Sequence, residues 1–250
     1  MNNYKAEEPL LYVDNLSVGY DGKMILKDIS FVEHNITREG HKSTGQTIAF
    51  IGRSGRGKST LFKALTGLIA PTTGQVLITD MESEDKDDAK PVKEGDIGFV
   101  DQKYTLFRHE TIEQICMYAL RKSKATKAEK LEIINKYLVE WGLDEHRKKY
   151  SCELSGGQRQ RTAIIEQMLS SKHFMILDEP ASGLDVGNIE KLKQSFERIS
   201  NTNEYNTTIF STHDINLAVE LADSIYIIGF PEGITDYSTI VKHYDLKAMG

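Results

Sequence analysis

The chain has 250 residues, of which 39% are hydrophobic and 27% charged, and its net charge is −6. These values fit a globular α/β domain with room for a small appended subdomain, and the acidic balance argues against a nucleic-acid-binding protein, which would need a basic face. No apolar run is long enough to span a bilayer, no signal peptide is visible, and Cys116 and Cys152 lack metal-ligand spacing and are expected to be reduced thiols.

The first hundred residues read mainly as strands around one helix. Short strands are predicted over 10–32, with a turn at Tyr20-Asp21-Gly22, and the polar segment 33–46 is expected to be a hairpin or loop. The following predictions are a buried strand at 47–51, a helix at 59–69, a strand at 75–79, a solvated acidic loop at 80–96 and a strand at 97–100.

The second part of the chain alternates between helices and strands after a long helical block. Residues 111–170 are predicted to be helical, including Thr111–Lys122 and Lys127–Trp141. The predictions that follow are strands at Phe174–Leu177, Thr207–Phe210 and Ile225–Ile228, and helices at 187–199 and 214–222. Alternation of this kind predicts a mainly parallel sheet, with the helical block as a subdomain inserted into it.

A glycine-rich motif follows the strand predicted at 47–51. The sequence from Gly52 to Thr60, GRSGRGKST, fits the phosphate-binding pattern G-x-x-x-x-G-K-[ST] between a strand and a helix. Its backbone amides and the helix N-terminus would hold phosphate, Lys58 would reach the β- and γ-phosphates, and Ser59 would bind Mg²⁺. The residues expected to bind nucleotide here are Gly52, Ser54, Gly55, Gly57, Lys58, Ser59 and Thr60.

Two acidic residues end the apolar strand predicted at Phe174–Leu177. Their position places Asp178 and Glu179 at the carboxyl edge of the sheet, where ligands of such sheets bind. Asp178 suits binding of Mg²⁺, and Glu179 is then free to orient or deprotonate an attacking water. The predicted activity is hydrolysis of ATP with Mg²⁺.

The sequence Leu154-Ser155-Gly156-Gly157-Gln158 resembles the signature of the ATP-binding cassette (ABC) ATPase family. The resemblance runs over about residues 11–229 and implies a P-loop NTPase core with a mainly parallel sheet, an antiparallel β subdomain and an inserted helical subdomain. The implied division is one domain over 1–250, with core and β subdomain at about 10–102 and 172–230, helical subdomain at about 103–171, and a C-terminal tail at 231–250.

The resemblance also implies roles for single residues. Tyr20 would stack on adenine, Gln102 would sense the γ-phosphate and Mg²⁺, Asp185 would belong to the D-loop, and His213 would act as the switch histidine beside catalytic Glu179. Residues 155–158 would contact the nucleotide held by another cassette.

Some residues depart from the family pattern. Arg53 and Arg56 make the P-loop more basic, Asp101 stands beside Gln102 where an apolar residue or proline is usual, and Glu166 replaces a usual arginine on the signature helix. None of these departures removes a catalytic group, although Glu166 puts salt bridges normally made at that position in doubt.

The partners that the resemblance implies are a second ABC ATPase domain, in an ATP-dependent homodimer, and membrane-spanning transporter subunits. Thr111-Ile-Glu-Gln resembles the T-V-x-E-N run of importer ATPases, and the apolar residues before and within it, Tyr104, Leu106, Phe107 and Ile112, are expected to form the coupling surface. The expected location is therefore the cytoplasm, on the cytoplasmic face of the membrane. A soluble ABC ATPase that assembles or remodels a cytosolic complex is the alternative, and a nucleotide-binding module without turnover is a third possibility.

Overall fold

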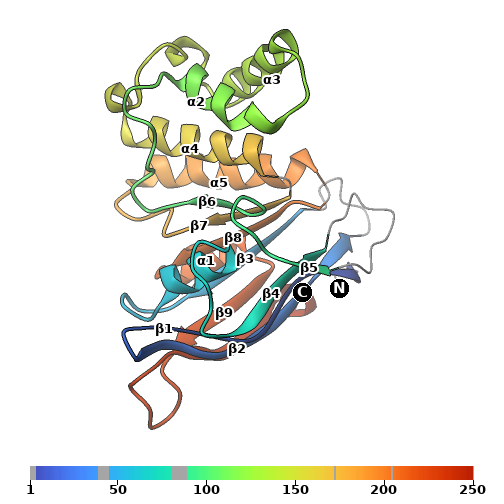
Figure 1. The fold of residues 1–250 in the computed structure, drawn as a ribbon, viewed down its shortest axis with the longest axis vertical. Helices are drawn as coiled ribbons and strands as arrows, with labels where there is room; N and C mark the ends of the chain where they lie inside the picture. The colour runs from blue at the N-terminus through green and yellow to red at the C-terminus, as the bar shows by residue number, and fades with distance from the viewer. Residues whose placement is uncertain (1–3, 39–44, 80–88, 172, 204, 250) are drawn as a thin grey trace.

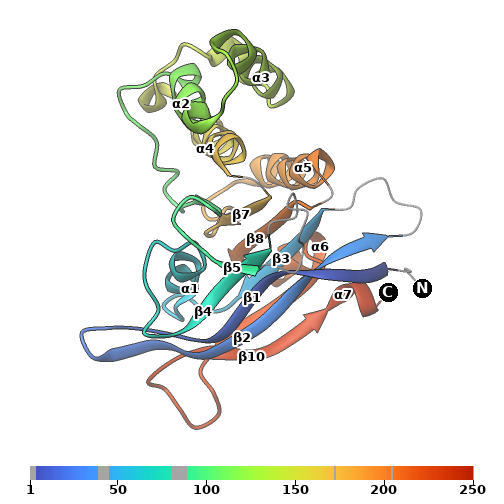
Figure 2. The same ribbon diagram turned by 45° about the vertical axis from the view of Figure 1, so that its right-hand side comes forward.

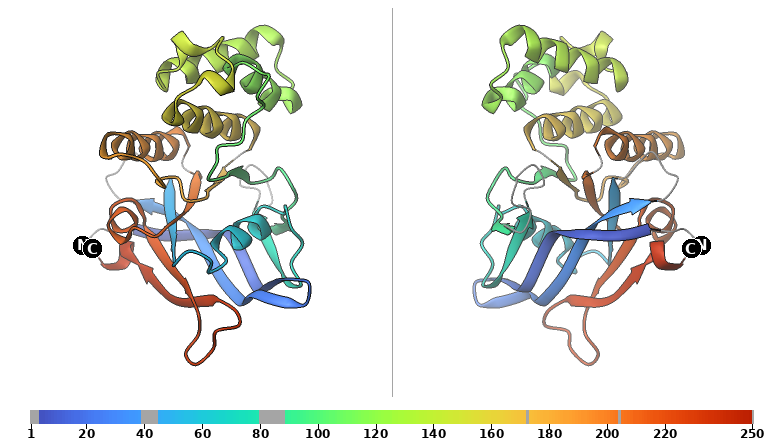
Figure 3. Two further views of the ribbon diagram at one scale, coloured as in Figure 1. Left: turned by 90° about the vertical axis from the view of Figure 1, so that its left-hand side faces the viewer. Right: turned by 90° about the vertical axis from the view of Figure 1, so that its right-hand side faces the viewer.

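A computed structural model describes residues 4–38, 45–79, 89–171, 173–203 and 205–249. Two β-sheets form one end of the molecule, and the helices α2 (Ile112–Ala119) and α3 (Lys127–Glu140) lie at the opposite end (Figure 1). Figure 3 shows from both sides that helices α4 (Gly156–Ser170) and α5 (Val186–Thr202) lie between these two ends. The mixed α/β architecture expected from the sequence is confirmed.

The first sheet is antiparallel, with strand order β2-β1-β4-β5. Its strands are β1 (Tyr4–Tyr20), β2 (Lys23–Arg38), β4 (Thr73–Thr79) and β5 (Ala89–Pro91). The short strands predicted over 10–32 are instead one long hairpin, because Asp21 and Gly22 have positive φ angles of 49° and 77°, which lets a tight turn follow the strand twist.

The prediction of a hairpin or loop over 33–46 was wrong for residues 33–38, which continue β2. Polar residues favoured a loop in the prediction, but a polar side chain can be buried where a partner satisfies it. Glu33 is buried and accepts a 2.7 Å hydrogen bond from the Tyr226 hydroxyl of the other sheet. Burial raises the pKa of this carboxyl group. Residues 39–44 and the acidic residues 80–88 lie outside the described part, whereas 89–91 form β5 rather than a loop.

The second sheet has the strand order β10-β9-β3-β8-β7-β6 and is parallel except for β10. Its strands are β3 (Gln46–Ile51), β6 (Gly98–Val100), β7 (Phe174–Leu177), β8 (Thr207–Thr212), β9 (Ser224–Gly229) and β10 (Thr239–Asp245). The mainly parallel sheet is confirmed. The segment 231–250 was expected to be a tail, but it supplies β10 and the short helix α7 (Leu246–Met249), so it belongs to the folded core.

Most of the longer helices begin at a residue whose side chain caps the first turn, whereas the helix after Gly57 has no side-chain cap. The longer helices are α1 (Lys58–Leu65), α2 (Ile112–Ala119), α3 (Lys127–Glu140), α4 (Gly156–Ser170), α5 (Val186–Thr202) and α6 (Ile215–Leu221), with 3₁₀ turns at Leu120–Lys122, Asp144–His146 and Ser151–Glu153. Thr111, Thr126 and Ser155 each form a reciprocal capping box with the residue three positions on, which satisfies two backbone donors that the helix start would leave unpaired.

Two apolar clusters cover the two faces of the parallel sheet. On one face, Phe62 of α1 packs with Phe50 of β3 and with the antiparallel sheet, so α1 lies between the two sheets (Figure 2). On the other face, Phe196 of α5 packs on Phe210 of β8. None of the described helices is both long and apolar enough to cross a bilayer.

The parallel register brings several strand ends to one edge. Val100 is paired with Leu177, Leu177 with Phe210, and Ile51 with Thr212. The chain leaves β3, β6, β7 and β8 at this common edge, so the segments that follow them are neighbours in space. These segments carry most of the residues singled out in the sequence.

Candidate active site

The loop between β3 and α1 needs its glycines for different reasons. A Cβ atom on Gly52 would lie 2.6 Å from the carbonyl oxygen of Ile228, so the loop can leave β3 here only without a side chain. Gly55 and Gly57 have φ angles of 76° and 87°, in the left-handed region that glycine adopts without steric cost. Together they curl the backbone into the start of α1, which Gly57 caps.

Lys58 is the buried cation of this loop. Its ammonium group donates to the carbonyl oxygens of Gly52 at 2.7 Å and Arg53 at 3.3 Å, and it lies 3.2 Å from Oε1 of Glu179. Only 5% of Lys58 is exposed, so this ion pair is shielded from water on the lysine side. Ser59 is exposed at the beginning of α1 and Thr60 is half-buried, and Ser54 is exposed at the loop.

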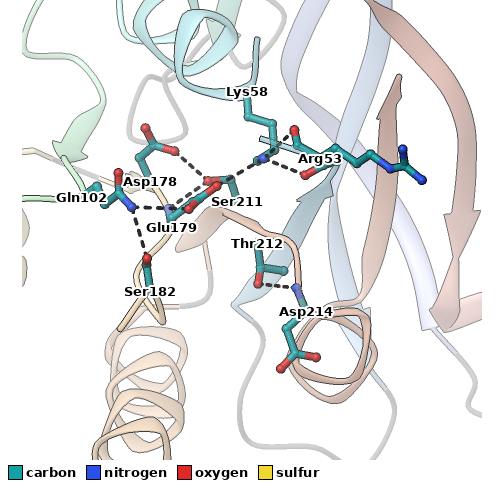
Figure 4. Close-up of polar contacts among 10 residues, drawn as sticks. Arg53, Lys58, Gln102, Asp178, Glu179, Ser182, Ser211, Thr212 and Asp214 are labelled. Atoms are coloured by element: carbon teal, nitrogen blue, oxygen red, sulfur yellow. Dashed lines mark hydrogen bonds and ion pairs between the residues drawn. The ribbon is translucent and has the colours of Figure 1, made fainter. Parts of the chain in front are cut away.

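Both acidic residues after β7 are held by Ser211, near the end of β8. The Ser211 hydroxyl donates to Oδ1 of buried Asp178 at 2.7 Å and accepts from the Glu179 backbone N–H at 2.8 Å. One hydroxyl therefore fixes the relative position of the two acidic residues. Figure 4 shows Asp178, Glu179, Ser211 and Lys58 converging, while the Arg53 side chain points away.

Gln102 joins this cluster from the end of β6. Its side-chain amide donates to Oε2 of Glu179 at 3.4 Å and to the Ser182 hydroxyl at 3.2 Å. The Glu179 carboxylate thus has Lys58 on one oxygen and Gln102 on the other (Figure 4). The sequence placed these three residues in one site, and the structure brings them together.

Asp101, the unexpected carboxylate beside Gln102, shapes the loop that follows β6. It accepts hydrogen bonds from the backbone N–H groups of Lys103 and Thr105 at 3.0 and 3.1 Å, and from the Thr105 hydroxyl at 2.6 Å. Tyr104 lies inside this turn with a φ angle of 50°. Asp101 therefore stabilises the backbone turn over residues 101–105.

Two residues of the site hold left-handed backbone conformations without being glycine. The φ angles are 47° at Glu179 and 50° at Tyr104. Each such residue costs on the order of 1–2 kcal/mol, so it persists only where surrounding contacts hold it. The hydrogen bonds around both residues supply that restraint.

The signature residues form the start of α4 and lie beside the D-loop. Ser155 accepts from the Gln158 N–H at 3.3 Å, and Gln158 accepts from the Ser155 N–H at 2.9 Å. A Cβ atom on Gly157 would lie 3.4 Å from the Asn188 amide oxygen, and Asn188 in turn donates to Asp185. Among the described residues, none of the hydrogen bonds or ion pairs joins residues 155–158 to the P-loop.

His213 and Tyr20 are both exposed. His213 follows β8, in a turn where the Asp214 N–H donates to the Thr212 hydroxyl at 3.0 Å (Figure 4). Tyr20 ends β1 at the tip of the hairpin and is 47% exposed. Their assigned roles remain predictions, as do those of the other site residues.

Two residues that depart from the family pattern, Arg56 and Glu166, have defined surroundings in the structure. The guanidinium carbon of Arg56 lies 3.5 Å from the centre of the Phe230 ring, a cation–π contact that holds it against the segment after β9. Glu166 on α4 lines a cavity of about 310 Å³ together with Glu94, Arg121 and Lys122, and burial raises its pKa to about 7.

The sequence did not predict three residues of this site. Ser211 and Ser182 had no expected role of their own, and Tyr104 was expected only in the coupling surface. A serine near the end of a predicted strand does not by itself indicate a functional residue. The contacts of Ser211 arise because the β7 and β8 ends meet, which depends on the sheet register.

Comparison with known proteins gives consistent results. A family model described as "ABC transporter" matches residues 39–182, more than half of the chain. The chain is similar to the putative 2-aminoethylphosphonate import ATP-binding protein PhnT of Salmonella typhimurium, with 32% identity over 239 residues covering 96% of this chain and 59% of the relative. It is also similar to the sulfate/thiosulfate import ATP-binding protein CysA 1 of Rhizobium meliloti, with 34% identity over 206 residues covering 78% of this chain and 58% of the relative.

Solved structures share the same fold. CbiO1 from Clostridium perfringens, part of the ABC transporter complex CbiONQ, has a TM-score of 0.75 and 25% identity, covering 97% of this chain and 91% of that chain. The ATP-binding subunit of another ABC transporter has a TM-score of 0.73 and 24% identity, covering 96% and 91%, and supports the fold.

The chain spans about three-fifths of the length of the curated relatives that it matches. The matched region nevertheless contains the P-loop at 52–60, the signature at 154–158 and both carboxylates. On this evidence the chain belongs to the ABC transporter family.

Proposed function

We propose that this chain binds and hydrolyses ATP with Mg²⁺ and powers a membrane transporter of the importer type. The observation that carries the proposal is the cluster at the P-loop mouth, where Glu179 lies between Lys58 and Gln102. A carboxylate in this position is available to orient or deprotonate water beside a phosphate that Lys58 binds.

Each residue of the cluster has a distinct part in hydrolysis. The P-loop amides and Lys58 bind the phosphates, and Glu179 orients the attacking water and accepts its proton. Gln102 contacts Glu179 and connects it to the loop that leaves β6. His213 is exposed at the same edge, where it would contact the γ-phosphate.

The donors present fit Mg²⁺ bound together with nucleotide. Asp178 is a buried carboxylate, Ser59 offers a hydroxyl and Gln102 an amide oxygen. Among the described residues, no group of three or more His, Cys, Asp or Glu side chains could hold a metal on its own. Mg²⁺ commonly takes one or two carboxylates and completes its shell with phosphate and water, and it would neutralise the charge on the phosphates.

The exposed signature turn supports a pairing of two cassettes. Residues 155–158 present a helix N-terminus with its first N–H groups, a site that suits an anion. The anion would be the γ-phosphate bound by the second cassette, and two identical chains would form a C₂ homodimer.

A groove beside the core supports the coupling to membrane subunits. A hollow of about 510 Å³ is lined by Phe107, Glu110, Gln114, Met117, Tyr118 and Arg121. Under the transporter hypothesis it receives a short helix of a membrane-spanning subunit, so that the chain lies on the cytoplasmic face of the membrane. The alternative is a soluble ABC ATPase that remodels a cytosolic complex, in which case the groove receives a soluble partner.

The exchange Glu179→Gln tests hydrolysis directly. It keeps the side-chain shape and leaves the P-loop intact, so ATP affinity should be retained while turnover falls by about 10²- to 10⁴-fold. Steady-state phosphate release and equilibrium binding of ATP with Mg²⁺ measure the two quantities. Glu197→Gln, at an exposed glutamate of α5, is the matched control. Wild-type turnover in the Glu179→Gln variant would remove Glu179 from this role.

A further inference from the structure

The carbonyl oxygen of Pro180, the residue after Glu179, accepts two side-chain hydrogen bonds. The Tyr104 hydroxyl donates to it at 2.8 Å, and Nε2 of Gln160 donates at 2.9 Å. Tyr104 belongs to the loop that begins at Gln102, and Gln160 lies in the first turns of α4, the helix of the signature. Three separate segments of the site therefore meet at one backbone oxygen.

We propose that Tyr104 is a positioning residue for ATP hydrolysis, because its hydroxyl fixes the backbone that carries the Glu179 carboxylate. The inference rests on the proposed function of Glu179. On the N-terminal side, the Glu179 N–H is held by Ser211 at 2.8 Å. On the C-terminal side the ring of Pro180 restricts its φ angle, and Tyr104 and Gln160 hold its carbonyl.

This double restraint explains how Glu179 keeps a disfavoured backbone conformation. Its φ angle of 47° lies in the left-handed region, and such residues persist only where their surroundings over-determine them. Release of the Pro180 carbonyl would let the Glu179 backbone relax. The carboxylate would then shift relative to Lys58 and Gln102, its two side-chain contacts.

Tyr104 is itself held in place before it reaches Pro180. The turn closed by Asp101 sets the φ angle of Tyr104 at 50°, and the Tyr104 N–H donates to the Asp101 carbonyl at 3.1 Å. The same turn contains Gln102. A displacement of this loop is thus conveyed to the Glu179 region by two routes, the Gln102 amide and the Tyr104 hydroxyl.

The exchange Tyr104→Phe removes only the hydroxyl and keeps the ring in its half-buried place. The loss of one neutral hydrogen bond should lower kcat by about three- to tenfold. The described contacts of the Tyr104 hydroxyl involve Pro180 and none of the predicted nucleotide ligands. The dissociation constant for ATP with Mg²⁺ should therefore stay at its wild-type value, and the variant should remain folded at the assay temperature.

A second variant tests the shared acceptor. Gln160→Met removes the other donor to Pro180, and the double variant should show a fall in kcat that differs from the product of the two single effects, since residues with a common partner are not independent. Tyr137→Phe is the matched control, because Tyr137 is also half-buried and the structure gives its hydroxyl no hydrogen bond in the described part. It should keep wild-type kcat.

The outcomes separate the two proposals. ATP hydrolysis by the wild-type chain, together with its loss in Glu179→Gln, supports the proposed function. If the wild-type chain does not hydrolyse ATP, or if Glu179→Gln hydrolyses it at the wild-type rate, the proposed function and this inference both fail. If the wild type turns over, equal kcat in Tyr104→Phe and Tyr137→Phe overturns the positioning role alone. Three other results would also overturn it. The effects on kcat could multiply in the double variant, the change could be confined to ATP affinity, or the loss of kcat could be accounted for by unfolding of the variant at the assay temperature.

Discussion

Glu166 shows what a single half-buried carboxyl group does to the molecule. It stands on α4 inside the cavity that Glu94, Arg121 and Lys122 also line. Burial raises its pKa from 4.5 to about 7, and the positive charge of Arg121 opposes that rise. The folded state binds this proton more tightly than the unfolded state. Proton binding by Glu166 therefore contributes fully to the free energy of unfolding below pH 4.5, and this contribution is lost as the pH rises through about 7.

Glu166→Gln should therefore stabilise the chain more at alkaline pH. A neutral amide avoids the cost of burying a charge, so the gain in unfolding free energy should be about 2 kcal/mol larger at pH 8 than at pH 5.5. Urea denaturation at the two pH values measures the difference. Glu132→Gln, at an exposed glutamate of α3, controls for the loss of one surface charge. Equal gains at both pH values for Glu166→Gln would contradict the effect of burial.

The segment after β6 divides its apolar residues between core and surface. Ile112, expected in the coupling surface, is the first residue of α2 and is fully buried, so this part of the prediction was wrong. Phe107 is 51% exposed and packs edge-on against Tyr118, with ring centres 5.3 Å apart. Arg121 lies over the other aromatic of this pair, 4.3 Å from the Tyr118 ring centre. The exposed groove is thus made by Phe107 and α2.

Phe107→Asp should abolish co-purification with membrane subunits, because it places a charge in the apolar groove. ATP binding by the isolated chain should be retained, since Phe107 lies outside the candidate active site. Pull-down from solubilised native membranes measures the association, and Val139→Asp, at an exposed apolar residue of α3, is the matched control. If the wild-type chain associates only with soluble proteins, the transporter hypothesis fails and the remodelling hypothesis replaces it.

At the scale of the whole molecule, the proposed pairing of two chains concerns the signature turn and the P-loop. Ser155 of the signature turn and Ser54 of the P-loop are both exposed, and none of the described hydrogen bonds joins the two segments. Bound nucleotide would join the signature of one chain to the P-loop of another. With a net charge of −6 on each chain, the pair should form only when the phosphates and Mg²⁺ lie between the surfaces.

Glu179→Gln with ATP and Mg²⁺ should consequently be a dimer in light scattering. Adding Ser155→Arg to this variant should leave a monomer that still binds ATP, because the large side chain fills the anion site but does not touch its own P-loop. Ser170→Arg, at the other end of α4, adds the same charge and should not disturb the dimer. A persistent monomer at tens of micromolar Glu179→Gln protein would contradict a homodimer.

Local sequence determined the phosphate loop, the order of the core strands and helices, and the family. The glycines at 52, 55 and 57 are needed by the backbone itself, and β7 matches its prediction at both ends because four apolar residues precede two acids. Such features depend on neighbours in the chain, so a pattern of residues is enough to predict them.

Only the tertiary structure decided which polar residues belong to the core and which hydroxyls belong to the site. Glu33 reads as part of a loop, but Tyr226 from the other sheet satisfies it inside the protein. The polar segment of β10 is held by pairing with β9 and by His243, whose ring stacks on Tyr226 at 4.2 Å. Contacts of this kind join residues about 20 to 190 positions apart, and they exist because the sheets bring those strands together; no local pattern of residues encodes them.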